Sequence, residues 1–389
     1  MSAAATPART GAMIGTVVGI ALLNHIGFAG GRVAITIAAL HDGATPLTLG
    51  LLMSCIGLLP MLTAVAVGRL SDRIGTRRPL IIGTLLVTVG VGAPSLVGGL
   101  GGLYLAVVFG GLGHQTWQIA IQHWVGSRAP AGRRVQWFTL LAFGVSFSNL
   151  IGPILAGFAL DGVGARSTFL LLALFPATAL VILRFVPISE TPRIEREPGA
   201  RRGAWSLMEN PRLARLLAAS TLVAVAWDLH SFVVPILGVQ RGFSSSTIGL
   251  VLGTFGAATI LVRAGMPWLS RRLDEWTMVR TAVGIALAVF ALYPFAPGVE
   301  LMIALSFALG LGLGACQPNV LALLNDVVPP GRIGEAVGLR MTLGQASQVI
   351  LPVAFGSAGF AVGIAPIFWA MAAALGAGSW FLRTPDKSV

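Results

Sequence analysis

Long apolar segments follow one another along almost the whole chain, separated by short polar stretches. The clearest is residues 79–127, which contain no Asp, Glu, Lys or Arg. One helix of that length would be roughly 70 Å long, whereas the hydrocarbon core of a bilayer is about 30 Å thick. The stretch therefore has to turn, and we expect the turn in the glycine-rich run 98–102.

The same reasoning along the chain predicts twelve membrane-spanning helices, each long enough to cross a bilayer. They cover residues 13–39, 47–68, 79–98, 103–125, 135–160, 167–186, 213–238, 245–268, 278–297, 300–325, 335–357 and 364–383. The predicted fold class is an all-α integral membrane protein with twelve transmembrane helices.

Composition supports a membrane protein and excludes other classes. Of the 389 residues, 55% are hydrophobic and only 10% are charged, whereas a soluble domain has about a quarter of its residues charged. So few charges also exclude a disordered chain, and two cysteines exclude a disulfide scaffold.

The distribution of basic residues predicts the orientation of the helices. With the N-terminus in the cytoplasm, the inner loops hold twenty Lys and Arg residues and the outer loops hold two, Arg166 and Arg241. The positive-inside rule then places both termini in the cytoplasm. We expect a multi-pass protein of the cell inner (plasma) membrane without a cleavable signal. The net charge of +12 is a topology signal that suits an anionic lipid bilayer, so we expect no nucleic acid partner.

The two halves of the chain repeat each other. The polar stretch 187–212 is typical of a cytoplasmic linker, and it separates a six-helix bundle at 1–186 from a second at 213–389. A shift of 199 residues aligns the halves without a gap, pairing Gly50 with Gly249, Gly57 with Gly256, Gln118 with Gln317, Ser148 with Ser347, Pro153 with Pro352, and Gly157 with Gly356. Parallel six-helix repeats are a known plan of secondary transporters.

Polar residues inside the apolar segments recur in every third helix. The predicted helices 3, 6, 9 and 12 contain no Asn, Gln, His, Asp or Glu, whereas helices 1, 4, 7 and 10 do. Because polar groups in a membrane must face protein or water, we expect these four helices to line a central cavity and the other four to face lipid. The expected residues for substrate binding and proton coupling are Asn24, His25, Arg32, His114, Gln115, Gln118, Trp227, Asp228, His230, Gln317 and Asn319.

Asp228 is the one acidic residue well inside a predicted helix. The repeat aligns Arg32 with Ser231, one helical turn beyond Asp228, so both charges lie at similar depth on facing helices. An ion pair across the cavity is therefore expected, because either charge alone would be costly in a membrane interior. A structural role for Asp228 is the alternative. His230 and His25 are either proton carriers or simply hydrogen-bonded residues.

A specific motif follows the second predicted helix. It reads Gly68-Arg69-Leu70-Ser71-Asp72-Arg73-Ile74-Gly75-Thr76-Arg77-Arg78. Its spacing resembles the signature of the major facilitator superfamily, and together with the repeat the resemblance covers nearly the whole chain. The resemblance implies two pseudo-symmetric six-helix bundles. It also implies a conformational latch in which Asp72 meets the start of the eleventh helix or its Arg340, with latch residues Gly68, Asp72, Arg73, Gly75, Arg77 and Arg340.

A second motif lies in the fifth predicted helix, at Gly144, Ser148, Gly152, Pro153 and Gly157. It resembles the Gly-Pro motif of proton-coupled drug and small-solute antiporters, which implies a bend packed against the eighth helix. A proline-kinked helix with small packing residues is the alternative. The arginine that drug antiporters would carry near Phe109 is missing here.

These features together predict secondary active transport by alternating access, with no enzymatic activity, no cofactor and no metal. No nucleotide-binding loop is present in the sequence. We expect proton-coupled export of a small amphiphilic or drug-like compound by a monomer, with the small-molecule substrate and protons as partners. Two alternatives stay open: uptake of a small organic anion by proton symport, which Arg32 favours, and a non-transporting membrane sensor or receptor on a transporter fold.

Overall fold

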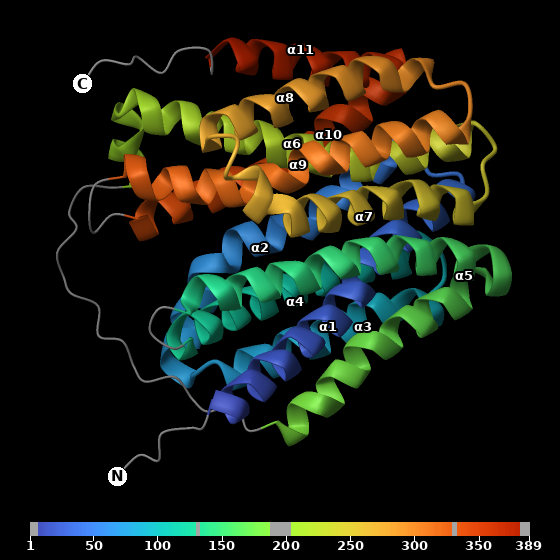
Figure 1. Cartoon of the computed structure of the whole chain (residues 1–389). Coiled ribbons are helices and arrows are strands. Elements are labelled where there is room, and N and C mark those ends of the chain that lie inside the picture. The colour runs from blue at the N-terminus through green and yellow to red at the C-terminus, as the bar shows by residue number, and fades with distance from the viewer. Residues whose placement is uncertain (1–6, 130–132, 187–203, 329–332, 382–389) are drawn as a thin grey trace.

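The computed structural model describes residues 7–129, 133–186, 204–328 and 333–381, which form a bundle of long helices (Figure 1). The first half contains α1 (Pro7–His41), α2 (Pro46–Ile74), α3 (Arg77–Leu96), α4 (Gly99–Arg128) and α5 (Arg134–Phe185). The second half contains the 3₁₀ helix η1 (Ala204–Glu209), α6 (Pro211–Gln240), α7 (Ser245–Leu269), α8 (Glu275–Leu292), the 3₁₀ helix η2 (Tyr293–Phe295), α9 (Val299–Val327), α10 (Ile333–Val362) and α11 (Ala365–Phe381).

The predicted all-helical membrane fold is confirmed, and each of the twelve apolar segments overlaps an observed helix, with ends that differ by a few residues. The fifth and sixth segments share α5, which is interrupted at Gly164 with φ 77° and ψ 168°; Figure 1 shows the chain reversing there. Between α3 and α4 the chain turns at Val97 and Gly98, at the start of the predicted run. By length and composition, eight helices of the described residues are apolar enough to cross a membrane.

Side-chain caps mark where several helices begin. Thr45 and Ser244 accept hydrogen bonds from the backbone of Thr48 and Thr247 at the starts of α2 and α7. Asp274 caps α8 in the same way, and hydrogen bonds from Thr277 hold the pKa of the Asp274 carboxyl below its usual value. Such caps satisfy N–H groups that have no partner inside the helix.

The two halves meet along two seams, α2 against α10 and α5 against α7. In the first seam, Gly50 of α2 lies directly against the backbone of Pro352 and Gly356 of α10. The second seam repeats this contact with the residues that the 199-residue shift pairs with these three, namely Gly249, Pro153 and Gly157. The internal repeat of the sequence is therefore present in the packing. The Gly-Pro motif packs against α7, which is the eighth predicted helix, as the resemblance implies.

Both seams are tight at the end of the bundle where α2 and α7 begin, which we call the far end; the end where α1 begins and α11 ends is the terminal end. At the far end, Asp161 of α5 accepts hydrogen bonds from the backbone N–H groups of Ser245 (3.0 Å) and Ser246 (2.7 Å) and from the Ser246 hydroxyl. One carboxylate of the first half thus completes the cap of a second-half helix. The 199-residue shift pairs Ser245 with Pro46 at the start of α2, and Pro46 has no N–H group that needs an acceptor.

Candidate functional site

A central cavity of about 380 Å³ lies between the two halves. Its walls come from α1, α2, α4 and the part of α5 before Gly164, and from α6, α7, α9 and α10. Among the described residues, none of α3, the later part of α5, α8 or α11 lines it. These four elements are the predicted helices 3, 6, 9 and 12, so the prediction that these helices stay away from the cavity is confirmed. The predicted lining was too narrow, because the predicted helices 2, 5, 8 and 11 also contribute residues to it. In the structure these are α2, the first part of α5, α7 and α10.

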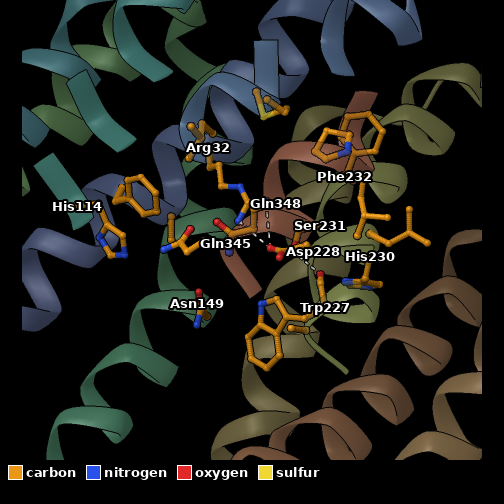
Figure 2. A pocket seen from close by; sticks show the side chains of 18 of the residues that line it. Arg32, His114, Asn149, Trp227, Asp228, His230, Ser231, Phe232, Gln345 and Gln348 are labelled. Carbon is orange, nitrogen blue, oxygen red and sulfur yellow. Dashed lines mark hydrogen bonds and ion pairs between the residues drawn. The ribbon is translucent and has the colours of Figure 1, made fainter. Parts of the chain in front are cut away.

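The centre of the cavity holds the predicted ion pair. Both terminal nitrogens of Arg32 on α1 lie 3.4 Å from Oδ1 of Asp228 on α6. Gln348 of α10 also forms a side-chain hydrogen bond with Asp228 (Figure 2). The side chains of Arg32 and Asp228 are only 28% and 12% exposed. The ion pair therefore links α1 of the first half to α6 of the second half, and Gln348 adds a contact from α10. All three residues are reachable from the cavity.

Polar side chains from α10 form further links to the first half. Gln345 donates from Nε2 to Oε1 of Gln115 on α4 at 2.9 Å. Neither Gln345 nor Gln348, nor Asn149 of α5, was among the predicted site residues, yet all three line the cavity. A signal for two of them is present in the sequence, since the 199-residue shift pairs Asn149 with Gln348.

Two predicted histidines form an aromatic wall on the first-half side of the cavity. The rings of Phe28 and His114 stack with centroids 3.9 Å apart, and His25 lies 5.2 Å from His114. Nδ1 of each histidine is buried and has no hydrogen-bond partner among the described residues. Both residues line the cavity, as does Gln118 one turn along α4 from His114.

His230 of α6 is anchored within the second half. Its Nε2 lies 3.0 Å from the hydroxyl of Ser306, and Ser306 donates its own proton to the carbonyl of Val251 at 2.6 Å. Because a hydroxyl has one proton to donate, His230 must be the donor in their contact. Trp227 packs edge-on against Phe255 with ring centroids 4.5 Å apart, and both rings face the cavity.

Some predicted cavity residues lie elsewhere. Asn24 is fully buried and does not line the cavity, and neither side-chain amide atom has a hydrogen-bond partner in the part of the chain that the structure describes. Asn319 is turned toward α8, where its Nδ2 approaches the sulfur of Met278 and donates to the carbonyl of Ala315 at 2.7 Å. For these two residues the cavity prediction was wrong, because a buried amide can face protein as well as water. Gln317 lies on α9, but its side chain is outside the described residues.

The predicted latch is described only in part. The side chains of Asp72 and Arg73 on α2 and the surroundings of Gly68 lie outside what the structure describes, so the Asp72 contact stays a prediction. Gly75 ends α2 with φ 78°, a conformation that glycine adopts readily. Arg77 donates to the carbonyl of Arg184 at 3.4 Å.

Arg340, the last residue of the predicted latch, lines the cavity. Its Nε donates to the hydroxyl of Ser220 on α6 at 2.9 Å (the Ser220 oxygen is the acceptor). A role in the cavity therefore has to be considered for this arginine.

Comparisons with known proteins agree with this geometry. The sequence profile of the Major Facilitator Superfamily matches residues 12–352 and 216–389. A tetracycline resistance protein, class G, of Vibrio anguillarum is 26% identical over 319 residues, which cover 79% of each chain. A putative sugar efflux transporter of Deinococcus radiodurans is 25% identical over 357 residues, covering 87% of this chain and 88% of the relative. The crystal structure of a POT family transporter in complex with 5-aminolevulinic acid shares the fold, with a TM-score of 0.77, 15% identity and 94% coverage of both chains.

Proposed function

We propose that this chain, which belongs to the Major Facilitator Superfamily, exports a small amphiphilic organic compound in exchange for protons. The family and its relatives identify a membrane transporter and not an enzyme. The single observation that carries the proposal is the Arg32–Asp228 ion pair, which joins the two halves inside the cavity. Export is supported by a relative named as an efflux transporter and by the Gly-Pro motif packed against α7.

The pair supplies a simple coupling step. A proton that reaches Asp228 neutralises the carboxylate and releases Arg32, so the electrostatic link between α1 and α6 is lost. Loss of the proton restores the link, because an unpaired charge is costly inside the protein. The two halves would then move about the glycine seams, and the cavity would open alternately toward each side.

The proposed topology gives each end of the bundle a side of the membrane. We place both termini and the linker 187–212 in the cytoplasm, between an N-terminal bundle at 1–186 and a C-terminal bundle at 213–389. The far end then faces outward, and the Asp161 contact closes the cavity on that side. Asp72 would act as the latch on the cytoplasmic side. We propose that the protein works as a monomer in the inner membrane.

One observation favours a second candidate, uptake of a small organic anion with protons. Among the described residues, the charged ones that line the cavity are two arginines, Arg32 and Arg340, and one carboxylate, Asp228. Such a lining suits an anion as well as an amphiphile, so the direction of proton flow has to decide between export and uptake.

Proteoliposomes containing a pH-sensitive dye test both candidates. With the lumen acidified, an exporter mounted in either orientation should exchange an added compound for lumenal protons, so the lumenal pH rises. A symporter should show the opposite sign, because the compound and protons enter together and the lumenal pH falls. A sensor should move neither solute nor protons, and liposomes without protein give the leak.

A further inference from the structure

The described residues that line the cavity carry a net positive charge, which remains after Arg32 and Asp228 neutralise each other. Arg32 is engaged by Asp228, whereas Arg340 has no carboxylate within ion-pair distance among the residues that the structure describes. Its one hydrogen bond in that part of the chain goes to the neutral hydroxyl of Ser220. Protonation of the histidines that line the cavity would only add to the positive charge.

Such an arginine is unfavourable without a counter-charge. Arg340 is half-buried at the cavity wall, where a cation loses part of its hydration. The Ser220 hydroxyl fixes the Nε side of the guanidinium, and the remaining N–H groups form the planar fork that suits a carboxylate or a similar anion. An anionic ligand would therefore compensate a charge that has no partner of opposite sign among the described residues.

The face of α6 beside Arg340 indicates the shape of the rest of the ligand. Ser220 and Asp228 lie two turns apart on this face, about 12 Å along the helix axis. Between them the cavity wall is formed by Val223, Ala224 and Trp227. The wall is thus apolar between an arginine at one end and the ion pair at the other (Figure 2 labels Trp227, Asp228 and Arg32).

We propose that Arg340, positioned by Ser220, binds the anionic group of the transported compound, and that the substrate class is an organic monoanion whose apolar body lies along Val223, Ala224 and Trp227. This inference rests on the proposed transport function, because the compound has to enter the cavity. It assigns separate roles to the two arginines: Arg340 binds the substrate, and Arg32 is released when Asp228 is protonated.

Thiol labelling with two reagents of opposite charge tests the proposal without knowledge of the substrate. The reporter is Ala224→Cys, one turn along α6 from Ser220, in a chain whose native thiols are removed by Cys55→Ser and Cys316→Ser. Purified protein is labelled with anionic sulfonatoethyl methanethiosulfonate or with cationic trimethylammonioethyl methanethiosulfonate. Each rate is divided by the rate of the same reagent with free 2-mercaptoethanol.

The anionic reagent should react faster than the cationic one by roughly tenfold after this correction, because one charge acts over a few ångströms in a partly desolvated cavity. Arg340→Gln should bring the ratio close to one, and Arg340→Lys should retain most of it. Arg263→Gln is the matched control, since Arg263 is a half-buried arginine of α7 that is not among the residues lining the cavity, so its replacement should leave the ratio unchanged.

Each outcome separates this inference from the proposed function. A ratio of one with Arg340 intact would overturn the anion site, whether or not Arg340→Gln folds, and so would a ratio that Arg340→Gln leaves unchanged. In both cases the reporter reacts and the transport proposal stands. If neither reagent reaches Ala224→Cys or Gln118→Cys, the cavity is closed to solutes and the proposed transport function itself fails.

Discussion

At the scale of single residues, the site depends on charges whose partners lie in the other half of the chain. Arg32 and Asp228 are 196 positions apart in the sequence, yet the sequence predicts their contact because the internal repeat sets both at the same depth. The same reasoning fails for Asn24 and Asn319. A polar residue in a membrane helix has to face protein or water, and the sequence does not distinguish between the two.

The ion pair predicts a non-additive pattern of stability. Arg32→Ala should lower the free energy of unfolding by about 3 kcal/mol, because it leaves Asp228 buried without its cation. The double variant Arg32→Ala/Asp228→Ala should be more stable than Arg32→Ala alone, since it removes the stranded charge. Thermal unfolding of the purified variants in detergent measures this difference. Additive losses in the single and double variants would show that the two charges are not coupled.

Asp161 predicts a change in the spacing of the halves at the far end. Asp161→Ala removes the acceptor of three hydrogen bonds from Ser245 and Ser246, so the α5–α7 seam should open more often. Spin labels at the exposed residues Val163 and Leu250 should then give a longer component in a double electron–electron resonance distance distribution.

Asp42→Ala is the control for the Asp161 variant, because it removes an exposed carboxylate from the same end of the bundle. It should leave the distance distribution as in the parent chain. Identical distributions for Asp161→Ala and the parent would mean that the carboxylate does not hold the seam.

At the scale of helices, the lengths of the apolar segments were sufficient to predict the order of the helices along the chain. The seams between the halves were predictable only in part: the Gly-Pro motif indicated α5 against α7, and the repeat then implies its counterpart between α2 and α10. The 3₁₀ helix η1 was not predicted, since its six residues lie in a polar stretch without helical periodicity. Its Leu207 is nevertheless buried, through contact with α6 and α10.

The glycine seams predict matched effects in the two halves. Gly50→Ala and Gly249→Ala each place a methyl group against a facing proline carbonyl, so each should destabilise the protein by about 1–3 kcal/mol. Gly284→Ala on α8 has open space around it and should be neutral or stabilising by up to about 1 kcal/mol. Unfolding midpoints compare the three variants. A Gly249→Ala variant as stable as Gly284→Ala would contradict the close approach of α5 and α7.

At the scale of the whole molecule, two related bundles surround one cavity, and the repeat explains why four helices stay outside it. The sequence predicted those four helices from their lack of polar side chains. It did not predict the cavity contributions of helices 2, 5, 8 and 11, because these helices line the cavity mostly with apolar side chains and prolines, to which helices 5 and 11 add three amides and Arg340.

Solvent access should follow this arrangement. In a chain without native cysteines, Gln118→Cys should react with a membrane-impermeant thiol reagent, whereas Leu172→Cys and Ala373→Cys should not. Leu172 is buried in the bundle, and Ala373 lies on α11, away from the cavity. Labelling yields by mass spectrometry measure the difference. Comparable yields at all three positions would refute the division into cavity and lipid-facing helices.

Proton coupling through Asp228 is the central claim, and one transport measurement tests it most directly. Asp228→Asn keeps the size of the side chain but cannot exchange a proton, so the two halves should still move while the proton gradient no longer drives them. In proteoliposomes supplied with a compound that the parent protein exchanges for protons, this variant should lose uphill accumulation and keep downhill exchange of the same compound. Uphill accumulation at the parent rate by Asp228→Asn would contradict the account.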